Sequence, residues 1–294
     1  SGGLAQTDPV ADMGDYTAGL LQLLEAQRSG VDVAASTHTS VDKLQQQLAR
    51  IVGPVDSFEP LPDSWTGDSE VEAGLRFFVF EAIEMHLAWR EMFGRADVGA
   101  VTRASQLIAE MLAYNGTDPD RYRLVDESYY AVGQYLDTDR LVTVAKRYMA
   151  AAERLTAVLE NSDRSLAGYD WVSPLGAVSL SGTEDDRHHG KYLLLIDTGG
   201  NDRYENIASP LALGGVTTVI DLGGNDSVVW NGLAGPGGGV LGSSLWIDMA
   251  GDDSYSGGSL GLGEGFFGVS VFSDRGGNDR YSSRALSQGV GQYG

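Results

Sequence analysis

The chain has 294 residues, 42% of them hydrophobic, which is enough for two domains with packed cores. Acidic residues outnumber basic ones by 41 to 20, and the formal net charge of -21 argues against binding nucleic acid, anionic membranes or polyanionic substrates unless cations intervene. The absence of cysteine excludes disulfides, thiolate metal sites and cysteine nucleophiles. The sequence contains no run of about 18 apolar residues of the kind that predicts a membrane span.

Glycine divides the chain into two parts. Residues 1–165 contain 12 of the 40 glycines, and residues 166–294 contain the other 28. Apolar residues recur at spacings of three and four in the first part, as in helices, whereas the second part reads as short strands and turns. We therefore predict a multidomain α+β protein, with an α-helical bundle over residues 1–165 and a β-domain over residues 166–294.

The bundle should hold five or six helices. The best defined helix begins after Asp68 or Ser69, either of which can cap it, and runs to about Phe93. This helix is apolar on most sides, so we expect it at the centre of its domain. A helix over 139–160 keeps a single apolar face. The other expected helices lie at 16–28, 41–51, 98–114 and 119–135, and the proline-containing stretch 53–66 is expected to be a loop.

The β-domain contains a motif that occurs four times. Its form is Asp-x-Gly-Gly-Asn-Asp-x-Tyr with small variations, and the copies begin at Asp197, Asp221, Asp248 and Asp274, which lie 24, 27 and 26 residues apart. A fixed period in this range is typical of solenoids, in which each repeat stacks on its neighbour. We predict a parallel β-solenoid of β-helix type with coils of about 26 residues, each with two or three short strands. The glycine pair provides positive φ and close backbone approach.

Two segments flank the regular repeats. A first strand is expected over 171–181, followed by a turn over 182–190 that is a degenerate copy of the motif, with Asp186 at the place of Asp202 and His188 at the place of Tyr204. At the other end, Gly294 occupies the repeat position that Gly268 holds one coil earlier. We therefore expect the solenoid to be interrupted in the middle of a coil at residue 294.

The residues before each motif alternate as in a strand. The first, third and fifth residues before the leading Asp are expected to face inward. The second residue before it is large and apolar in every copy: Leu195, Val219, Trp246 and Phe272. We expect this apolar stripe on the outside, where the helical domain covers it or where a protein or glycan partner binds.

The stacked turns are candidate metal sites. Equivalent Asp residues would form columns about 4.8 Å apart, and unpaired carboxylates at that spacing repel one another. Ca²⁺ takes six to eight hard oxygen ligands in flexible geometry, so Ca²⁺ between the coils would relieve the repulsion. The alternative is a metal-free Asx turn, in which the leading Asp accepts backbone N–H bonds. The candidate ligands are Asp197, Asn201, Asp202, Asp221, Asn225, Asp226, Asp248, Asp252, Asp253, Asp274, Asn278 and Asp279.

The turns resemble the glycine- and aspartate-rich turns of the RTX family, whose nonapeptide Gly-Gly-x-Gly-x-Asp repeats bind Ca²⁺ in a parallel β-roll. The match is partial, because the period here is about 26 residues and Gly-Asn-Asp replaces the Gly-x-Asp step. The alternation of Asp-x-Gly-Gly-Asn-Asp-x-Tyr with Gln-Gly-x-Gly-x-x-Gly is more similar to a group of poorly characterised bacterial secreted repeat proteins. This resemblance covers about residues 182–294 and implies no established activity.

A weaker alternative site lies in the degenerate turn, which mixes imidazoles with acids: Glu184, Asp185, Asp186, His188 and His189. Transition-metal or acid–base chemistry would suit this mixture. Two adjacent His on a strand point to opposite faces, so both cannot easily bind one ion. Elsewhere the sequence has no Glu-x-x-His helix motif, no Gly-x-Ser-x-Gly and no phosphate loop, so no catalytic residue is assigned.

Besides a helical domain that binds a partner while the solenoid acts as a spacer, two functions remain open at this stage. The first is a non-enzymatic, calcium-stabilised solenoid that is secreted, periplasmic or on the cell surface, and that acts as a structural, adhesive or partner-binding module. The second is a polysaccharide-acting lyase or hydrolase with paired carboxylates in a solenoid groove, assisted by aromatic residues such as Trp230 and Trp246. We favour the first.

Overall fold

The computed structural model describes residues 64–94, 133–163, 166, 168–207, 214–231, 234–259, 261–284, 288–289 and 291–292. The helices expected at 16–28, 41–51 and 98–114, and nearly all of the one at 119–135, lie outside these residues. The bundle as a whole and the domain boundary near residue 165 therefore stay predictions. The described residues all belong to the unit formed by residues 39–294.

Helix α3 (Ser69–Phe93) begins and ends where the sequence predicts. Asp68 is its N-cap, because the Asp68 carboxylate accepts hydrogen bonds from the backbone amides of Glu70 and Val71 at 2.8 and 3.1 Å. Helix α6 (Thr138–Glu160) begins in the same way, with Asp137 accepting from the amide of Arg140 at 3.1 Å. Both of these predicted helices are confirmed.

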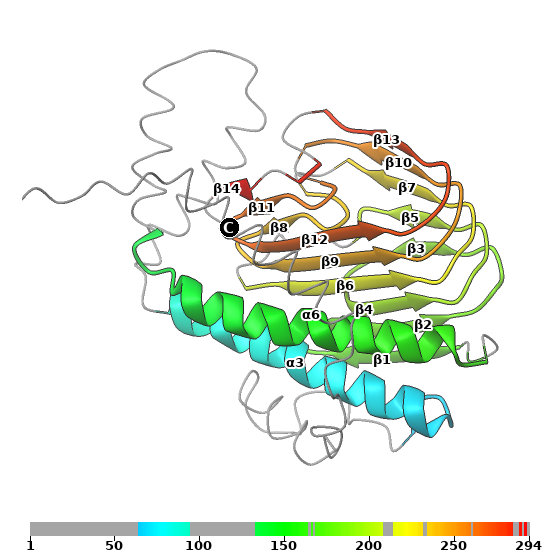
Figure 1. The fold of residues 1–294 in the computed structure, drawn as a ribbon, viewed down its shortest axis with the longest axis horizontal. Helices are drawn as coiled ribbons and strands as arrows, with labels where there is room; N and C mark the ends of the chain where they lie inside the picture. Colours follow the sequence, from blue (N-terminus) through cyan, green and yellow to red (C-terminus); the bar gives the residue numbers. More distant parts are fainter. Residues whose placement is uncertain are drawn as a thin grey trace, which may run out of the picture. The chain divides into compact units, whose positions relative to one another are not determined.

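The two helices lie side by side and run along one sheet of the solenoid (Figure 1). The rings of Phe78 on α3 and Tyr148 on α6 pack with their centroids 5.5 Å apart. Glu81 is buried at this interface, and Arg147 of α6 forms an ion pair with it at 2.7 Å. The buried side of α3 is wide, as expected for a central helix: Val71, Leu75, Phe78, Val79, Ala82, Ile83, Met85, Ala88, Trp89, Met92 and Phe93.

Within the described residues, the solenoid has three sheets whose strands pair in parallel, apart from the antiparallel pair β1–β2. The first sheet contains β1 (Tyr169–Ser173), β2 (Gly176–Ser181), β4 (Tyr192–Asp197), β6 (Val216–Asp221), β9 (Ser243–Asp248) and β12 (Val269–Asp274). The second contains β3 (Arg187–His189), β5 (Arg203–Glu205), β7 (Ser227–Trp230), β10 (Ser254–Gly257) and β13 (Arg280–Ser282). The third contains β8 (Gly239–Val240), β11 (Gly265–Phe266) and β14 (Gly291–Gln292). The predicted parallel β-solenoid is confirmed.

The single strand predicted over 171–181 is wrong, because the chain makes a hairpin there. Strands β1 and β2 pair antiparallel on either side of Pro174 and Leu175. Ser173 holds the turn, since its hydroxyl donates to the carbonyl of Gly176 at 2.6 Å and accepts from the amide of Leu175 at 3.1 Å. Strand β1 thereby covers the edge of β2, which would otherwise be an unpaired end of the parallel sheet.

The apolar stripe faces the inside of the solenoid, so the predicted orientation of the strands is wrong. Leu195, Val219 and Trp246 are buried in one cluster with Tyr204 and Tyr255 of the second sheet, and Phe272 packs against it partly buried. The predicted inner face lies against the helices instead. A parallel strand buried on both faces carries apolar residues on both, so alternation alone cannot tell them apart.

Polar contacts fix the helices on that outer face of the first sheet. Trp89 of α3 donates its indole N–H to the hydroxyl of Ser243 at 2.8 Å. Tyr148 of α6 donates to the carbonyl of Thr217 at 3.2 Å and also contacts the hydroxyl of Thr218. The helical part therefore covers the sheet, as expected, but it covers the face opposite to the stripe.

The turns stack so closely that the second glycine of each motif has no room for a side chain. At Gly224, where φ is +155°, a Cβ would lie 1.6 Å from the carbonyl oxygen of Gly200 in the preceding coil. At Gly277, where φ is +146°, it would lie 1.5 Å from the carbonyl oxygen of Gly251. The first position is less demanding, because Ala250 occupies it in one copy.

Replacing Gly277 should therefore damage the last described coil, whereas its neighbour Gly276 should tolerate the same change. A Cβ on Gly276 would meet only the carbonyl of Met249 at 3.7 Å. We expect Gly277→Ala to lower the free energy of unfolding by about 2 kcal/mol or more, or to unfold this coil locally. Urea titrations and amide hydrogen exchange measure the two effects. Equal stability of Gly277→Ala and Gly276→Ala would contradict this packing.

Candidate metal centre

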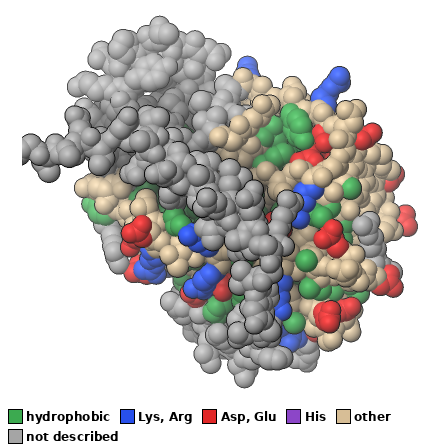
Figure 2. Space-filling view, in the orientation of Figure 1, with side chains coloured by type: hydrophobic (Ala, Val, Ile, Leu, Met, Phe, Trp, Pro, Cys, Tyr) green, Lys and Arg blue, Asp and Glu red, His purple; other side chains and the backbone are tan. Residues whose placement is uncertain are grey.

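Two columns of aspartate run along the solenoid. The strand-end column consists of the leading Asp of each motif: Asp197, Asp221, Asp248 and Asp274. These residues pair directly with one another in the register of the first sheet. The turn column consists of the Asp five residues later in each motif: Asp202, Asp226, Asp253 and Asp279. On the face shown in Figure 2, acidic side chains gather along the margin that the turns form.

Each member of the strand-end column accepts one hydrogen bond from an aromatic residue. Tyr255 donates to Asp248 at 2.5 Å and Tyr281 donates to Asp274 at 2.6 Å, within the same coil. Tyr204 instead reaches Asp221 of the next coil. His188 does likewise, with its Nε2 2.6 Å from the Oδ2 of Asp197. The aromatic residues of the second sheet thus form a ladder of hydrogen-bond donors to the strand-end column.

Val228 explains why the partners change coil. It occupies the tyrosine position of the second motif and offers no donor, so Asp221 takes its bond from the coil before. At the start of the solenoid, Ser181 stands at the Asp position and needs no partner, which leaves His188 for Asp197. The acceptor missing at Ser181 and the donor missing at Val228 therefore compensate, and all four aspartates of the strand-end column are paired.

The other oxygen of the strand-end Asp forms the Asx turn that was the metal-free alternative. The amide of Gly199 donates to Asp197 at 3.0 Å, and the amide of Gly223 donates to Asp221 at 2.8 Å. Asp248 differs: Ala250 stands at the glycine position, and the Oδ1 of Asp248 is buried without a partner. The strand-end Asp residues therefore have a structural role whether or not they bind metal.

The turn column is only half satisfied. The amide of Asp202 donates to the Oδ1 of Asp226 at 2.6 Å, and the amide of Asp226 donates to the Oδ1 of Asp253 at 2.7 Å. The same bond recurs from Asp253 to Asp279 at 2.9 Å. The Oδ2 atoms of Asp202, Asp226 and Asp253 are nevertheless buried and have no hydrogen-bond partner. Orphan buried carboxylate oxygens are rare in folded proteins and call for a proton, a buried water or a cation as partner.

Three all-aspartate groups lie where the columns meet. In each group one carboxylate oxygen of every residue lies within 4.8 Å of the others. The groups are Asp202–Asp221–Asp226, Asp226–Asp248–Asp253 and Asp253–Asp274–Asp279. Neighbouring groups share Asp226 or Asp253, so they form one continuous row. The turns therefore bring eight of the predicted ligands into or beside acidic clusters that could hold metal ions.

The remaining four predicted ligands lie at the surface and hold the turns together. The amide of Asn225 donates to the side-chain oxygen of Asn201 at 3.0 Å, and the amide of Asp252 donates to that of Asn225 at 2.8 Å. The amide of Asn278 continues the series by donating to Asp252 at 2.9 Å. All four side chains are exposed, so the structure gives them a stacking role.

Burial and mutual repulsion raise the pKa of the clustered carboxyls. The pKa rises to about 7 for Asp202 and to about 6 for Asp253, mainly because burial disfavours the charged form. It rises further, to about 10 for Asp226 and about 8 for Asp248, where neighbouring carboxylates add to the burial. The nearby arginines do not relieve this, since Arg203 pairs with Glu205 at 2.5 Å and Arg275 pairs with Glu153 at 2.5 Å.

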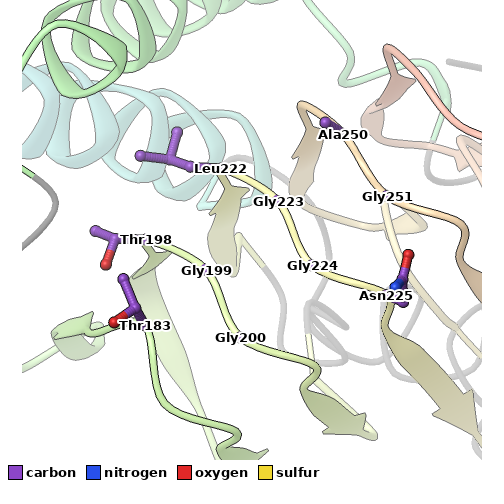
Figure 3. A pocket seen from close by; sticks show the side chains of 10 residues that line it. All are labelled: Thr183, Thr198, Gly199, Gly200, Leu222, Gly223, Gly224, Asn225, Ala250 and Gly251. Atoms are coloured by element: carbon purple, nitrogen blue, oxygen red, sulfur yellow. The ribbon is translucent and has the colours of Figure 1, made fainter.

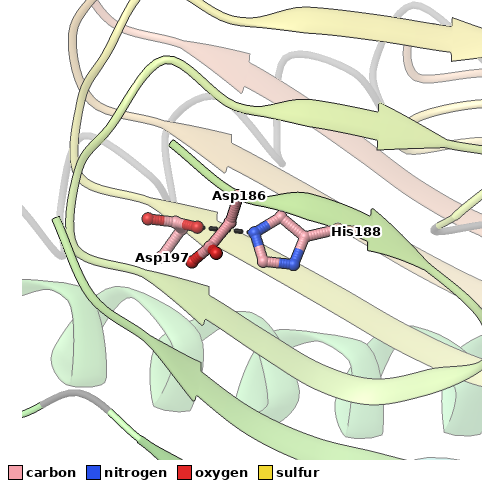
Figure 4. A group of neighbouring side chains, drawn as sticks. All are labelled: Asp186, His188 and Asp197. Carbon is pink, nitrogen blue, oxygen red and sulfur yellow. Dashed lines mark hydrogen bonds and ion pairs between the residues drawn. The ribbon is translucent and has the colours of Figure 1, made fainter. Parts of the chain in front are cut away.

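The degenerate turn places its acids and imidazoles differently. His188 is buried and His189 is exposed on the opposite face of β3, as expected for neighbours on a strand. Asp186 and Asp197 join His188 in a group whose ligand atoms all lie within 4.8 Å (Figure 4). Glu184 and Asp185 stay exposed outside it, and Asp185 accepts from the amide of Asn201 at 2.8 Å.

An open groove of about 510 Å³ runs over the glycine turns (Figure 3). Its polar side chains come from Thr183, Thr198 and Asn225, and glycines provide most of the rest of its lining. The two tryptophans considered for a sugar-binding groove, Trp230 and Trp246, are 1% and 0% exposed. The groove thus offers backbone groups rather than paired carboxylates or aromatic platforms.

Glu264 is a buried acid that sequence reasoning missed. It lies just before β11 in a glycine-rich segment, is 1% exposed, and neither carboxylate oxygen has a partner. Burial raises its pKa to about 8. The sequence did contain a signal for this residue: Glu264 is an acid among small residues, and the equivalent position one coil earlier is Gly238.

No protein-family model, curated protein sequence or solved structure matches the chain. None of the described helices is both long enough and apolar enough to span a bilayer.

The tyrosine ladder can be tested with Tyr255→Phe. Because the Oδ1 of Asp248 already lacks a partner, losing the phenol leaves both oxygens unpaired in a buried site. We expect the free energy of unfolding to fall by about 1–3 kcal/mol. Tyr281→Phe is the matched control, because Tyr281 is 41% exposed and water can replace its hydroxyl. Chemical denaturation should show the smaller loss for Tyr281→Phe, and the reverse order would contradict the assignment.

Glu264 should make stability depend on pH. Its pKa is raised from 4.5 to about 8 in the folded state, so the folded chain binds more protons than the unfolded chain between these values. Stability is therefore lost as pH rises through about 8, and Glu264→Gln should remove this part of the loss. In chelator, the variant should match the wild type near about pH 5 and exceed its free energy of unfolding near about pH 9. Exposed Glu160→Gln is the control and should change neither; parallel pH profiles for Glu264→Gln and wild type would contradict the burial of a lone acid.

Proposed function

We propose that the chain is a calcium-stabilised β-solenoid that serves as a structural, adhesive or partner-binding module outside the cytoplasm. The observation that carries the proposal is the row of orphan carboxylate oxygens in the turn column, the Oδ2 atoms of Asp202, Asp226 and Asp253. They lie in groups of three carboxylates, and cations between the coils would give all of them partners.

A hard cation fits this row better than a softer one. The three groups offer only oxygen ligands, and backbone carbonyls of the turns and water can add more. Ca²⁺ accepts such irregular sets of six to eight oxygens, whereas Mg²⁺ demands a near-ideal octahedron. Protons could instead neutralise the acids, because their pKa values are raised. The two outcomes differ in their response to added Ca²⁺.

The location follows from the same chemistry. Ca²⁺ sites in extracellular modules bind with dissociation constants of about 10⁻⁴–10⁻³ M, which suits surroundings where free Ca²⁺ is high, outside the cytoplasm. The chain has no cysteine that would depend on redox conditions, and its formal charge of -21 favours solubility. The resemblance to secreted repeat proteins points in the same direction.

A module role is supported by how the acids are used. The clustered aspartates serve the stacking of coils, and the groove beside them presents mainly glycine. Stacked coils give a stiff scaffold with a regular surface, which suits attachment or spacing more than chemistry. Helices α3 and α6 close one side of this scaffold through their contacts with β6 and β9.

The test compares two adjacent residues, Asp253 and Asp252. Asp253 belongs to two of the clusters, whereas exposed Asp252 stands where the other motifs have Asn. For the wild type and Asp252→Asn, Ca²⁺ at 100 times Kd should add about 2.7 kcal/mol to the free energy of unfolding for each site that it fills. Asp253→Asn should lose most of this gain. In chelator, Asp253→Asn should be at least as stable as the wild type, because a buried repulsive charge has been removed.

Calorimetric melting with Ca²⁺ and with chelator measures these differences. An unchanged Tm of the wild type in saturating Ca²⁺ would overturn the calcium proposal and leave protonated carboxyls as the explanation. An equal Ca²⁺ response in Asp253→Asn would show that the ions bind elsewhere.

A further inference from the structure

The first coil differs from all the others at the point where the two columns meet. Position seven after the leading residue holds Tyr204, Tyr255 and Tyr281 in three coils, and His188 takes this place in the first. His188 stacks on Tyr204 with the ring centroids 4.9 Å apart, so it keeps the packing of the ladder. It adds what a tyrosine lacks, a ring nitrogen that can bind a metal ion.

Three donors converge at this place. The Nε2 of His188 lies 2.6 Å from the Oδ2 of Asp197, both residues are buried, and a carboxylate oxygen of Asp186 completes a group within 4.8 Å (Figure 4). We propose that this group is a distinct site for a first-row transition-metal dication such as Zn²⁺, held by one imidazole nitrogen and two carboxylate oxygens. This site is separate from the calcium row, the three all-aspartate groups from Asp202 to Asp279, which have only oxygen donors.

The chemistry of the donors selects the ion. Imidazole suits Zn²⁺, Cu²⁺, Ni²⁺ and Fe²⁺, whereas Ca²⁺ and Mg²⁺ prefer oxygen. Three protein donors leave a coordination position for water, and Asp186 lies on the partly exposed side from which water can enter. With metal–ligand bonds of about 2 Å, tetrahedral donors lie about 3.3 Å apart, so the His188–Asp197 pair must open by about 0.7 Å.

Neighbouring contacts hold the donors in place, and only the hydrogen bond between His188 and Asp197 has to give way to an ion. The backbone amide of Asp186 donates to the Oδ1 of Asp202 at 2.5 Å, which fixes the turn and leaves the Asp186 carboxylate available. The amide of Gly199 donates to the Oδ1 of Asp197 at 3.0 Å, so the Oδ2 of Asp197 faces His188.

The chain offers a conservative variant and a matched control. His188→Tyr places the ladder's usual residue in the first coil, where a phenol can donate to Asp197 of the next coil as Tyr204 donates to Asp221. His189→Tyr changes the adjacent imidazole, which is exposed on the opposite face of β3. Asp186→Asn removes a donor at the accessible edge and keeps the backbone amide that holds the turn.

The experiment titrates Co²⁺ into full-length protein in saturating Ca²⁺, so that the calcium row does not compete. The wild type and His189→Tyr should bind one equivalent that shows nitrogen-ligand absorption bands and is displaced by one equivalent of Zn²⁺. His188→Tyr should lose this equivalent while its circular dichroism and its Ca²⁺-dependent rise in Tm are unchanged. Asp186→Asn should bind Co²⁺ about tenfold or more weakly.

Retention of the Co²⁺ equivalent by His188→Tyr, or a wild-type spectrum without nitrogen ligands, would overturn the proposal and leave His188 and Asp197 as a hydrogen-bonded pair. If His188→Tyr fails to fold, Asp186→Asn decides: unchanged Co²⁺ affinity in this variant would equally overturn it. Because Ca²⁺ stabilisation is read separately from the Co²⁺ spectrum, failure of this site and failure of the calcium row give different results.

Discussion

In-register parallel stacking is the constraint on which the rest of this structure depends. Every residue in a coil lies about 4.8 Å from its counterpart in the next, so any side chain that repeats must tolerate a copy of itself as a neighbour. Glycine meets this constraint because it has no side chain, as at Gly224. Tyrosine meets it by stacking its ring on the next one, as Tyr255 does on Tyr281. Aspartate is the exception, because a column of buried carboxylates is repulsive, and the turns must therefore recruit donors, protons or cations.

Three series of polar side chains meet this demand in different ways: the exposed Asn and Asp residues of the turns, the strand-end column and the turn column. The exposed Asn and Asp side chains satisfy the next backbone amide and remain in water. The strand-end aspartates take a phenol or imidazole, and most also close an Asx turn. The turn column binds one amide per residue and still leaves an oxygen buried and alone at Asp202, Asp226 and Asp253. Only the turn column therefore calls for cations, although the sequence motif contains the residues of all three series.

The repeat made most of the fold readable from the sequence. Period, glycine placement and strand position can be read locally and predicted the solenoid, and the three- and four-residue spacing of apolar residues predicted α3 and α6. The facing of the strands was not local: Trp246 and Ile247 are both buried, one inside the coil and the other on the opposite side of the strand, so hydrophobicity could not distinguish them. The site was half readable for a similar reason, since Asp252 and Asp253 look alike in sequence, and only burial separates a surface ladder from a cluster.

The gap at Val228 has a wider consequence. The aromatic donors and the aspartate acceptors of the strand-end column are equal in number over the described coils, although not within each coil. Before Val228 each donor bonds to the aspartate of the next coil, and after it each donor bonds to the aspartate of its own coil. A coil that carries both its aspartate and its tyrosine can be gained or lost at any level without stranding a charge. A coil that lacks its aspartate or its tyrosine leaves a partner unpaired unless another coil lacks the complementary residue. The number of complete coils can therefore vary more freely than the residues at these two positions.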